Sequence, residues 1–198
     1  MSDDTLKQHL GSYVAKLTKC LNDLDFSKIN AVVEAFERAW INSNHIYFVG
    51  NGGSAGNGQH LANDFVYGAT KGSKGLKVSS MAANTSVVTC LANDIGYDQI
   101  FSHQVSTFCD EGDILVLLSG SGNSPNVVSA CEQAKALGVE TIAITGFDGG
   151  KLKELADISI HTRVDDMQVS EDLQLIIFHM IMQAFYERHG ASASSRNA

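Results

Sequence analysis

The spacing of apolar residues along the chain changes near residue 45. Before that point, apolar side chains recur every three or four residues, over residues 6–21 and again over 29–40. Such spacing is typical of amphipathic helices, and Asp25 and Ser27 offer a cap between the two. Residues 1–43 are therefore predicted to form a helical hairpin, whose apolar faces pack either on the core or on a partner subunit.

Beyond residue 44, short aliphatic and β-branched runs alternate with helical stretches, an order that indicates a parallel sheet covered by helices on both faces. The predicted strands are 45–49, 76–80, 113–118, 140–145 and 157–161. Helices are expected at about 54–68, 85–94, 97–109, 124–137 and 168–187. The predicted fold class is α/β, a three-layer α/β/α sandwich with a five-stranded parallel sheet, flavodoxin-like or Rossmann-like, preceded by the N-terminal helical hairpin.

Length and charge narrow the kinds of protein that this chain can be. Its 198 residues, 44% of them hydrophobic, suit one sizeable core, so residues 1–190 are predicted to be a single domain with its α/β core over 44–188. The small, polar residues 191–198 are expected to be disordered. A net charge of -8 disfavours a broad surface for nucleic acid.

No apolar run approaches the roughly 20 residues that cross a bilayer. The four cysteines are widely spaced without a CxxC pair and are predicted to be reduced thiols. We therefore expect a cytoplasmic protein that binds neither membrane nor, directly, nucleic acid, and that holds any anionic ligand by local dipoles.

A Gly- and Ser-rich turn, Gly50–Ser54, follows the first predicted strand and leads into a helix. Free N–H groups at the start of a helix bind anions, and glycines let a ligand approach the backbone closely. Ser54 is suited either to cap the helix or to bind a ligand oxygen. Such turns also carry Gly and Ser for geometry alone, so this turn by itself leaves the two interpretations open.

A second turn of this kind, Ser119–Ser124, follows the third predicted strand, with Pro125 at the start of the next helix. Open α/β sheets bind ligands at the carboxyl ends of their strands. A flexible linker of similar composition would not be fused to an apolar strand. The two turns together favour a phosphate-binding site.

Two better-known phosphate motifs fit less well. Residues 50–55 match the loose GxGxx(G/A) pattern, yet no acidic residue closes the second strand near 79–83 to hold a ribose, so a dinucleotide enzyme is a weak alternative. The sequence GxxxxGK[ST] is absent from the chain, which removes the main class of nucleotide hydrolases.

Acid, base and metal-binding groups occur on two predicted helices. His60 and Asp64 are four residues apart and share a helix face, while Glu171 and His179 lie broadly on one side of the last helix. Sugar isomerisation through an enediol needs a base and an acid, and Asp64 as base with His179 as acid meets that need. The same four residues suit zinc or another divalent ion, although a carboxylate held tightly by a metal is a poorer base. A surface pair and a helix cap are the structural alternatives.

A further polar stretch ends in Asn93 and Asp94, and Asp94 is placed to accept hydrogen bonds from sugar hydroxyls. Together with the two turns and the acid/base groups, it completes a set of sequence segments that resembles the phosphoheptose isomerases, members of the sugar isomerase (SIS) domain superfamily. The resemblance runs in order through nearly the whole chain: Gly50-Asn51-Gly52-Gly53-Ser54, Gln59-His60, Ala92-Asn93-Asp94, residues 119–124 and 145–150, and the helix of His179.

The resemblance implies a homotetramer with active sites at subunit contacts. It also implies conversion of sedoheptulose 7-phosphate to D-glycero-D-manno-heptose 7-phosphate, for the heptose units of bacterial surface polysaccharides. The substrate-binding residues expected on this basis are Asn51, Gly52, Gly53, Ser54, Asn93, Asp94, Ser119, Gly120, Ser121, Ser124 and Glu171. Proton transfer falls to Asp64 and His179, and zinc, where present, to His60, Asp64, Glu171 and His179.

This chain departs from the family pattern around the proposed chemistry. It has Asp64 where the family has Glu, Glu171-Asp172 where it has Gln-Glu, Gln174 where it has His, and Gly68 where it has Arg. These changes leave the phosphate turns intact and add negative charge, which favours a bound cation. The alternative function is a non-catalytic phosphosugar-binding or replication-initiator-binding SIS protein, but the presence of His60, Asp64 and His179 together favours the enzyme.

Overall fold

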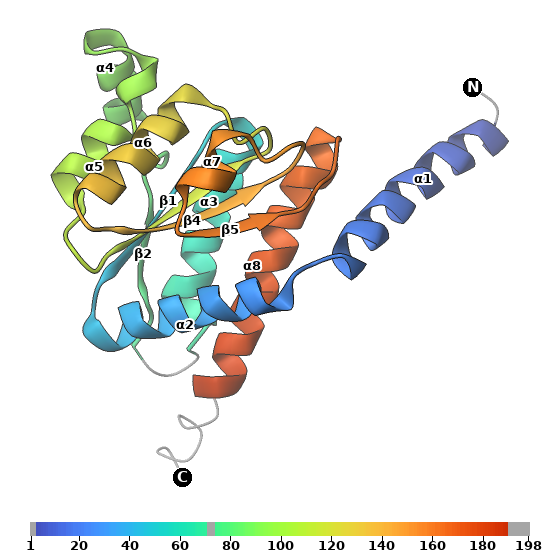
Figure 1. Ribbon diagram of the computed structural model, residues 1–198, viewed down its shortest axis with the longest axis horizontal. Coiled ribbons are helices and arrows are strands. Elements are labelled where there is room, and N and C mark those ends of the chain that lie inside the picture. Colours follow the sequence, from blue (N-terminus) through green and yellow to red (C-terminus); the bar gives the residue numbers. More distant parts are fainter. Residues whose placement is uncertain (1–2, 71–73, 190–198) are drawn as a thin grey trace.

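A five-stranded parallel sheet forms the centre of the computed structural model, which describes residues 3–70 and 74–189 (Figure 1). Its order is β2-β1-β3-β4-β5. All five predicted strands are confirmed to within one residue at each end: β1 (His45–Gly50), β2 (Lys77–Ser80), β3 (Ile114–Ser119), β4 (Glu140–Thr145) and β5 (Ile158–His161).

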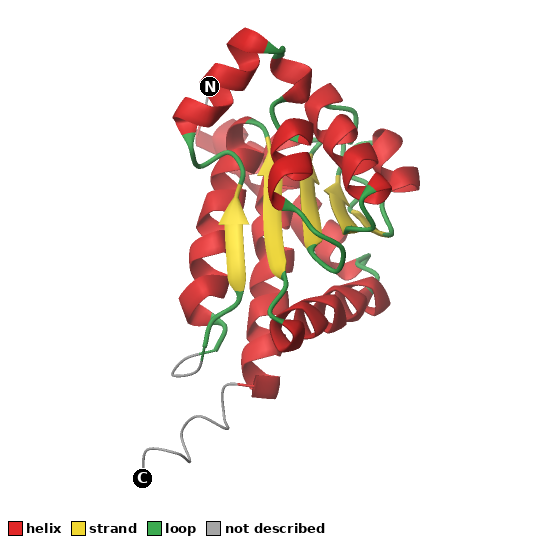
Figure 2. Cartoon of the chain, turned by 90° about the vertical axis from the view of Figure 1, so that its left-hand side faces the viewer, coloured by secondary structure: helices red, strands yellow, loops and turns green. Residues whose placement is uncertain are grey.

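Helices cover both faces of this sheet, which confirms the predicted three-layer α/β/α class (Figure 2). Alternate strand residues point to opposite faces, so Ile46 and Phe48 enter one core cluster while Tyr47 and Val49 enter the other. The first cluster is closed by α2 (Phe26–Asn42), α3 (Gly52–Asn63) and α8 (Met167–His189). The second is closed mainly by α5 (Ser102–Phe108), α6 (Pro125–Ala136) and α7 (Gly150–Leu155).

Four phenylalanines link the sheet to the helices of the first cluster. Phe36 of α2 meets Phe65 with ring centroids 5.0 Å apart, and Phe48 of β1 meets Phe178 of α8 at 5.2 Å. Phe65 and Phe178 also face each other at 6.3 Å, with their rings perpendicular. All four are fully buried, so the segments that carry them are held at fixed positions relative to β1.

The helices α1 (Asp3–Asn22) and α2 form the hairpin-like start of the chain. The predicted cap between them is present, because the Asp25 carboxylate accepts hydrogen bonds from the N–H and hydroxyl of Ser27. Tyr13 of α1 donates to Asp172 of α8, and this hydrogen bond raises the pKa of Tyr13 to about 12. The amino-terminal part of α1, ahead of Tyr13, extends away from the body of the molecule (Figure 1), while Leu17, Cys20 and Leu21 pack on the core.

Three helices differ from the sequence prediction. The helix expected at 54–68 is α-helical only to Asn63 and continues as a π-helical turn, Asp64–Gly68. The helix expected at 97–109 divides into a 3-10 turn, Tyr97–Gln99, and α5. The six-residue α7 was not predicted, because fewer than two turns carry too little periodicity to be recognised. The helix expected at 85–94 is α4 (Thr85–Asp94).

The predicted disordered tail, 191–198, lies outside the described residues. None of the helices found between residues 3 and 189, leaving aside 71–73, combines the length and the apolar character needed to cross a membrane.

Candidate active site

The two Gly/Ser turns lie side by side at the carboxyl edge of the sheet. Strands β1 and β3 are neighbours, with Gly50 paired to Leu118 at their ends, and each runs directly into one of the turns. The chain leaves β1 for β2 on one side and later returns to β3 on the other, so the crevice between them is the switch point where sheets of this order bind ligands.

The first turn is tied to its surroundings by side-chain amides. Asn51 and Asn126 exchange two hydrogen bonds of 2.8 Å, and the Tyr97 hydroxyl donates to Asn51 Oδ1 at 2.9 Å. Ser54, buried in the first turn of α3, accepts a hydrogen bond from Gln174 Nε2 at 3.0 Å. Of the residues predicted to contact substrate here, Asn51 thus joins the turn to α6, while Gly52, Gly53 and Ser54 form the amino end of α3.

The second turn is a compact loop of hydroxyls and backbone amides. Ser119 Oγ accepts from the Gly122 N–H at 3.1 Å and lies 3.4 Å from Ser124 Oγ. Gly122 has a φ of +67°, and a side chain on it would collide with the Gly149 carbonyl, so only glycine fits. Gly120 accepts the Gly146 N–H at 2.8 Å, which ties the turn to the loop after β4. A hollow of about 550 Å³ beside this turn is lined by Ser121, Asn123, Phe147, Asp148 and Asp165.

Three of the four predicted acid/base or metal-binding residues come together across two helices. Asp64 Oδ2 lies 3.3 Å from His60 Nε2 and 3.2 Å from His179 Nε2, and the two imidazole nitrogens are 3.2 Å apart. Asp64 Oδ1 accepts from Asn63 at 3.3 Å, which leaves Oδ2 as the atom shared with the histidines. We call these three residues the His–Asp–His cluster.

Buried aromatic residues adjacent in sequence hold this cluster in place. Phe65 follows Asp64 and Phe178 precedes His179, and both rings belong to the fully buried set beneath β1. Because each phenylalanine is fixed in the core, the side chain next to it is presented at the surface in a defined position. His60 is exposed, whereas Asp64 and His179 are half-buried.

The cluster fits a divalent metal such as zinc by the chemistry of its donors. Two neutral imidazoles and a carboxylate are common zinc ligands. Zinc–ligand bonds of about 2.0–2.1 Å arranged tetrahedrally place neighbouring ligand atoms about 3.3–3.4 Å apart, close to the three separations in this cluster. The three side chains thus suit a metal with N and O ligands.

Glu171, the fourth predicted ligand, lies elsewhere. Its carboxylate contacts the Cα side of Gly53 at the start of α3 so closely that any side chain on Gly53 would collide with it, and it is not among the three ligand atoms that cluster. Its position is therefore beside the first turn, at the end of α3 where backbone N–H groups attract anions.

Asn93 and Asp94 stand at the carboxyl end of α4. Asp94 accepts hydrogen bonds from Asn93 at 2.8 Å and from the Cys90 thiol, which hold the pKa of this carboxyl below its usual value. In the described part of the chain, none of its hydrogen bonds reaches the two turns.

Sequence reasoning did not identify the polar residues behind the turns. Asn57, Asn126 and Tyr97 take part in the hydrogen bonds that support the first turn, and Gln174 was noted only as a departure from the family pattern. Each is a single polar residue without a motif, so only the tertiary contacts reveal its place.

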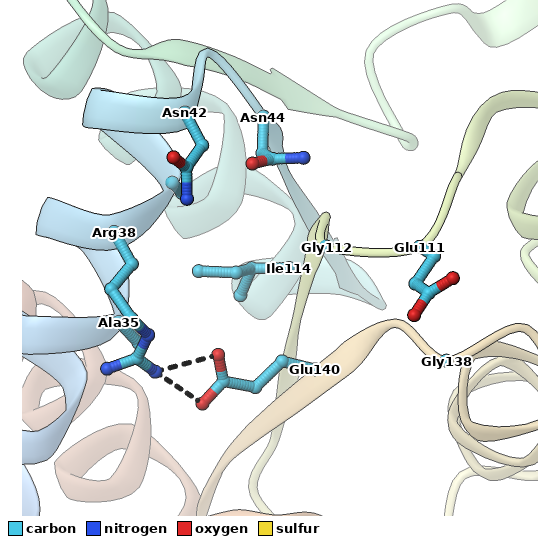
Figure 3. Close-up of a pocket in the computed structure, with 10 residues that line it drawn as sticks. Ala35, Arg38, Asn42, Asn44, Glu111, Gly112, Ile114, Gly138 and Glu140 are labelled. Atoms are coloured by element: carbon cyan, nitrogen blue, oxygen red, sulfur yellow. Dashed lines mark hydrogen bonds and ion pairs between the residues drawn. The ribbon is translucent and has the colours of Figure 1, made fainter.

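A separate hollow of about 310 Å³ lies near the amino ends of β3 and β4, away from both turns (Figure 3). Arg38 is the sole cation among its described lining residues, and it pairs with both Glu140 oxygens at 3.0 Å. Because that charge is already paired, this hollow is a weaker place for an anionic ligand than the carboxyl edge.

Comparison with known proteins agrees with this geometry. The sequence matches the SIS domain family over residues 11–146. It is 34% identical over 195 residues to the phosphoheptose isomerase of Helicobacter pylori (strain Shi470), covering 97% of this chain and 99% of that protein.

Two solved phosphoheptose isomerases share the fold. The structure from Neisseria gonorrhoeae gives a TM-score of 0.85 at 27% identity, and that from Francisella tularensis 0.86 at 25%; each comparison covers 93% of this chain and 98% of the other. The chain therefore belongs to the SIS domain family and, within it, to the phosphoheptose isomerases.

Proposed function

We propose that this phosphosugar isomerase converts sedoheptulose 7-phosphate to D-glycero-D-manno-heptose 7-phosphate. The observation that carries the proposal is the His–Asp–His cluster, which α8 and the α3–π segment form. It is supported by the two Gly/Ser turns, of a kind suited to anions, that lie side by side at the switch point of the sheet. The names of the relatives support a heptose phosphate as substrate.

The two turns would hold the phosphate. Ser54 contributes a hydroxyl at the start of α3, and Ser119, Ser121 and Ser124 contribute three more from the second turn. The helix dipole and the free N–H groups of the turns add attraction without a cationic side chain, which suits a chain of net charge -8. The remaining predicted contacts, including Asn93 and Asp94, are proposed for the sugar hydroxyls.

Isomerisation moves one proton between neighbouring carbons through an enediol. We assign removal of the C1 proton of the ketose to Asp64 Oδ2, while His179 Nε2 gives a proton to O2. Asp64 then returns its proton to C2 while His179 takes the proton of O1, which yields the aldose and restores the starting protonation state of both groups. Asp64 Oδ2 and His179 Nε2 lie 3.2 Å apart, so the base and the acid are within reach of the same pair of carbons.

Alternatively, the same side chains would bind a divalent metal. His60, Asp64 and His179 would hold it, and we propose that Glu171 joins them after a change of rotamer. A metal held by these residues would supply a Lewis acid for the sugar carbonyl. Asp64 then serves chiefly to bind and orient, because a carboxylate held by a metal is a weaker base.

We further propose a homotetramer whose active sites lie at subunit contacts, a single SIS domain over 1–190, and a role in supplying heptose for bacterial surface polysaccharides. The cytoplasmic location expected from the sequence stays a prediction.

Turnover of sedoheptulose 7-phosphate tests the proposal directly. The purified chain is incubated with this ketose in D₂O, with added zinc or with chelator, and NMR follows the aldose product and deuterium at its C2. We expect product in at least one condition. No product and no exchange in either condition would contradict an isomerase and favour the non-catalytic phosphosugar-binding alternative.

His179→Ala separates chemistry from binding. We expect turnover to fall by at least about 100-fold because the acid is lost, while the affinity for the phosphosugar, measured by calorimetry, changes little. His9→Ala, on the exposed surface of α1, is the matched control and should behave as the unaltered chain. A fully active His179→Ala variant would refute the assignment.

A further inference from the structure

A chain of three hydrogen-bonded side chains lies directly behind the first turn. Asn57 Nδ2 donates to the backbone carbonyl of Glu171 at 3.0 Å and to Gln174 Oε1 at 2.9 Å. Gln174 Nε2 in turn donates to Ser54 Oγ at 3.0 Å. Gln174 has no exposed surface and Ser54 is only 4% exposed, so this chain is part of the interior between α3 and α8.

One atom sets the direction of every hydrogen bond in this chain. A backbone carbonyl oxygen can only accept, so the group of Asn57 that contacts Glu171 O must be its NH₂. The atom of Gln174 that meets the same NH₂ must then be its carbonyl oxygen. The opposite end of the Gln174 amide, which faces Ser54, is therefore the NH₂ donor.

The Ser54 hydroxyl is consequently an acceptor toward the protein. In the part of the chain that the structure describes, Gln174 is its one hydrogen-bond partner, so the hydroxyl proton is left to donate elsewhere. Ser54 belongs to the first turn of α3, where backbone N–H groups also point toward an anion. Without Gln174, the hydroxyl could rotate and turn a lone pair toward the ligand.

We propose that Gln174 is a positioning residue for phosphate binding. It fixes the Ser54 hydroxyl so that its proton donates to the phosphate of the sugar phosphate, and Asn57 and the Glu171 carbonyl fix Gln174 in turn. The inference rests on the proposed function only in that it takes the first turn to bind phosphate; it does not require that the sugar is isomerised.

The decisive variant is Gln174→Glu, which keeps the shape of the side chain and reverses its polarity toward Ser54. One carboxylate oxygen still accepts from Asn57, while the other accepts the Ser54 hydroxyl proton and so turns it away from the ligand. We expect calorimetry at neutral pH to show inorganic phosphate and sedoheptulose 7-phosphate binding about 10-fold to 100-fold more weakly, the range for a lost hydrogen bond to a charged group. Thermal unfolding checks that the variant is folded.

A double-mutant cycle distinguishes orientation of Ser54 from simple charge repulsion. Ser54→Ala alone should weaken phosphate binding, and adding Gln174→Glu to it should weaken binding little further, because the hydroxyl through which Gln174 acts is gone. Gln183→Glu, exposed on the same helix, adds the same charge without touching Ser54 and should bind phosphate normally. Gln174→Met, which neither donates nor accepts strongly, should fall between Gln174→Glu and the unaltered chain.

Several outcomes would overturn the inference. The first is a folded Gln174→Glu variant that binds phosphate as tightly as the unaltered chain. The second is a Ser54→Ala variant that loses as much further phosphate affinity on addition of Gln174→Glu as the unaltered chain does. The third is an unaltered chain that does not bind phosphate. Failure of the proposed function looks different, because the unaltered chain would then bind phosphate and respond to these substitutions while leaving sedoheptulose 7-phosphate unconverted.

Discussion

The carboxylate of Glu171 lies against Gly53 at the amino end of α3, the end of a helix that attracts anions. Of its two predicted roles, substrate contact and metal ligand, this position beside the first turn is nearer to the first, because Glu171 lies apart from the His–Asp–His cluster. A carboxylate there would compete with, and repel, a phosphate that binds to the same turn. If the first turn binds phosphate as proposed, we expect this negative charge to lower its affinity.

Removal of that charge should strengthen phosphate binding. For Glu171→Gln, measured by calorimetry with inorganic phosphate in the presence of chelator, we expect about tenfold tighter binding at low salt, from a Coulomb energy of about 1–2 kcal/mol between partly solvated charges. The gain should shrink as salt is added. Glu132→Gln, an exposed site on α6, should change nothing, and an unaltered affinity in Glu171→Gln would contradict this interpretation.

At the scale of elements, the site depends on how α8 and the α3–π segment are fixed to β1. Asp64 starts a π-helical turn in which the Ala69 N–H donates to its carbonyl; such turns are often found at functional sites. Phe65 and Phe178 anchor the two segments in one aromatic cluster. Rotation of either helix would separate Asp64 from His179 even if both side chains stayed intact.

Loosening this anchor should therefore lower activity more than its effect on folding explains. Phe178→Leu leaves a smaller, differently shaped side chain beneath β1 and should lower the free energy of unfolding by about 1–2 kcal/mol, measured with urea. We expect the chain to stay folded, but kcat should drop several-fold because the His179 side chain is held less firmly relative to Asp64. Phe185→Leu serves as the control for stability alone, because Phe185 is equally buried but lies six residues after His179 on α8. Equal kcat in the two variants would show that the anchor does not position His179.

At the scale of the whole molecule, α1 leaves an apolar stripe without cover. Leu6, Leu10 and Val14 are 42%, 57% and 62% exposed, and their four-residue spacing places them on one face of the helix. Tyr13 binds Asp172 in α8, the helix that bears His179, and Lys16 binds Asp166 just before that helix. The two predicted options thus divide between the helices, because α2 packs on the core while the exposed stripe of α1 favours packing on a partner subunit.

If the protein forms the proposed homotetramer, we expect this stripe to pack against another subunit. Leu10→Asp places a charge where a subunit contact would exclude water, so light scattering after gel filtration should show a smaller species than the unaltered chain. Gln8→Asp, exposed on the same helix about 160° around its axis from Leu10, should keep the original size. A tetramer that tolerates Leu10→Asp would remove α1 from the interface, and a monomeric unaltered chain would contradict the tetramer itself.

The sequence by itself determined the features whose signals are local. Apolar runs located all five strands, and the glycine and serine turns that follow β1 and β3 were recognisable because each is continuous along the chain. The spacing of His60 and Asp64 on one helix was also sufficient to pair them. Once a parallel sheet was inferred, both turns could be placed at its carboxyl edge, but only the structure shows that β1 and β3 are neighbours there.

Only the tertiary structure decided how α8 faces the rest of the site. A helix presents many residues to its neighbours, and its rotation is set by buried contacts such as Phe178 against Phe48, which no local pattern encodes. That rotation brings His179 to Asp64, directs Glu171 to Gly53 and places Gln174 behind Ser54. Residues far apart in sequence acquire these roles through packing, because the core fixes the helix and the polar side chains follow.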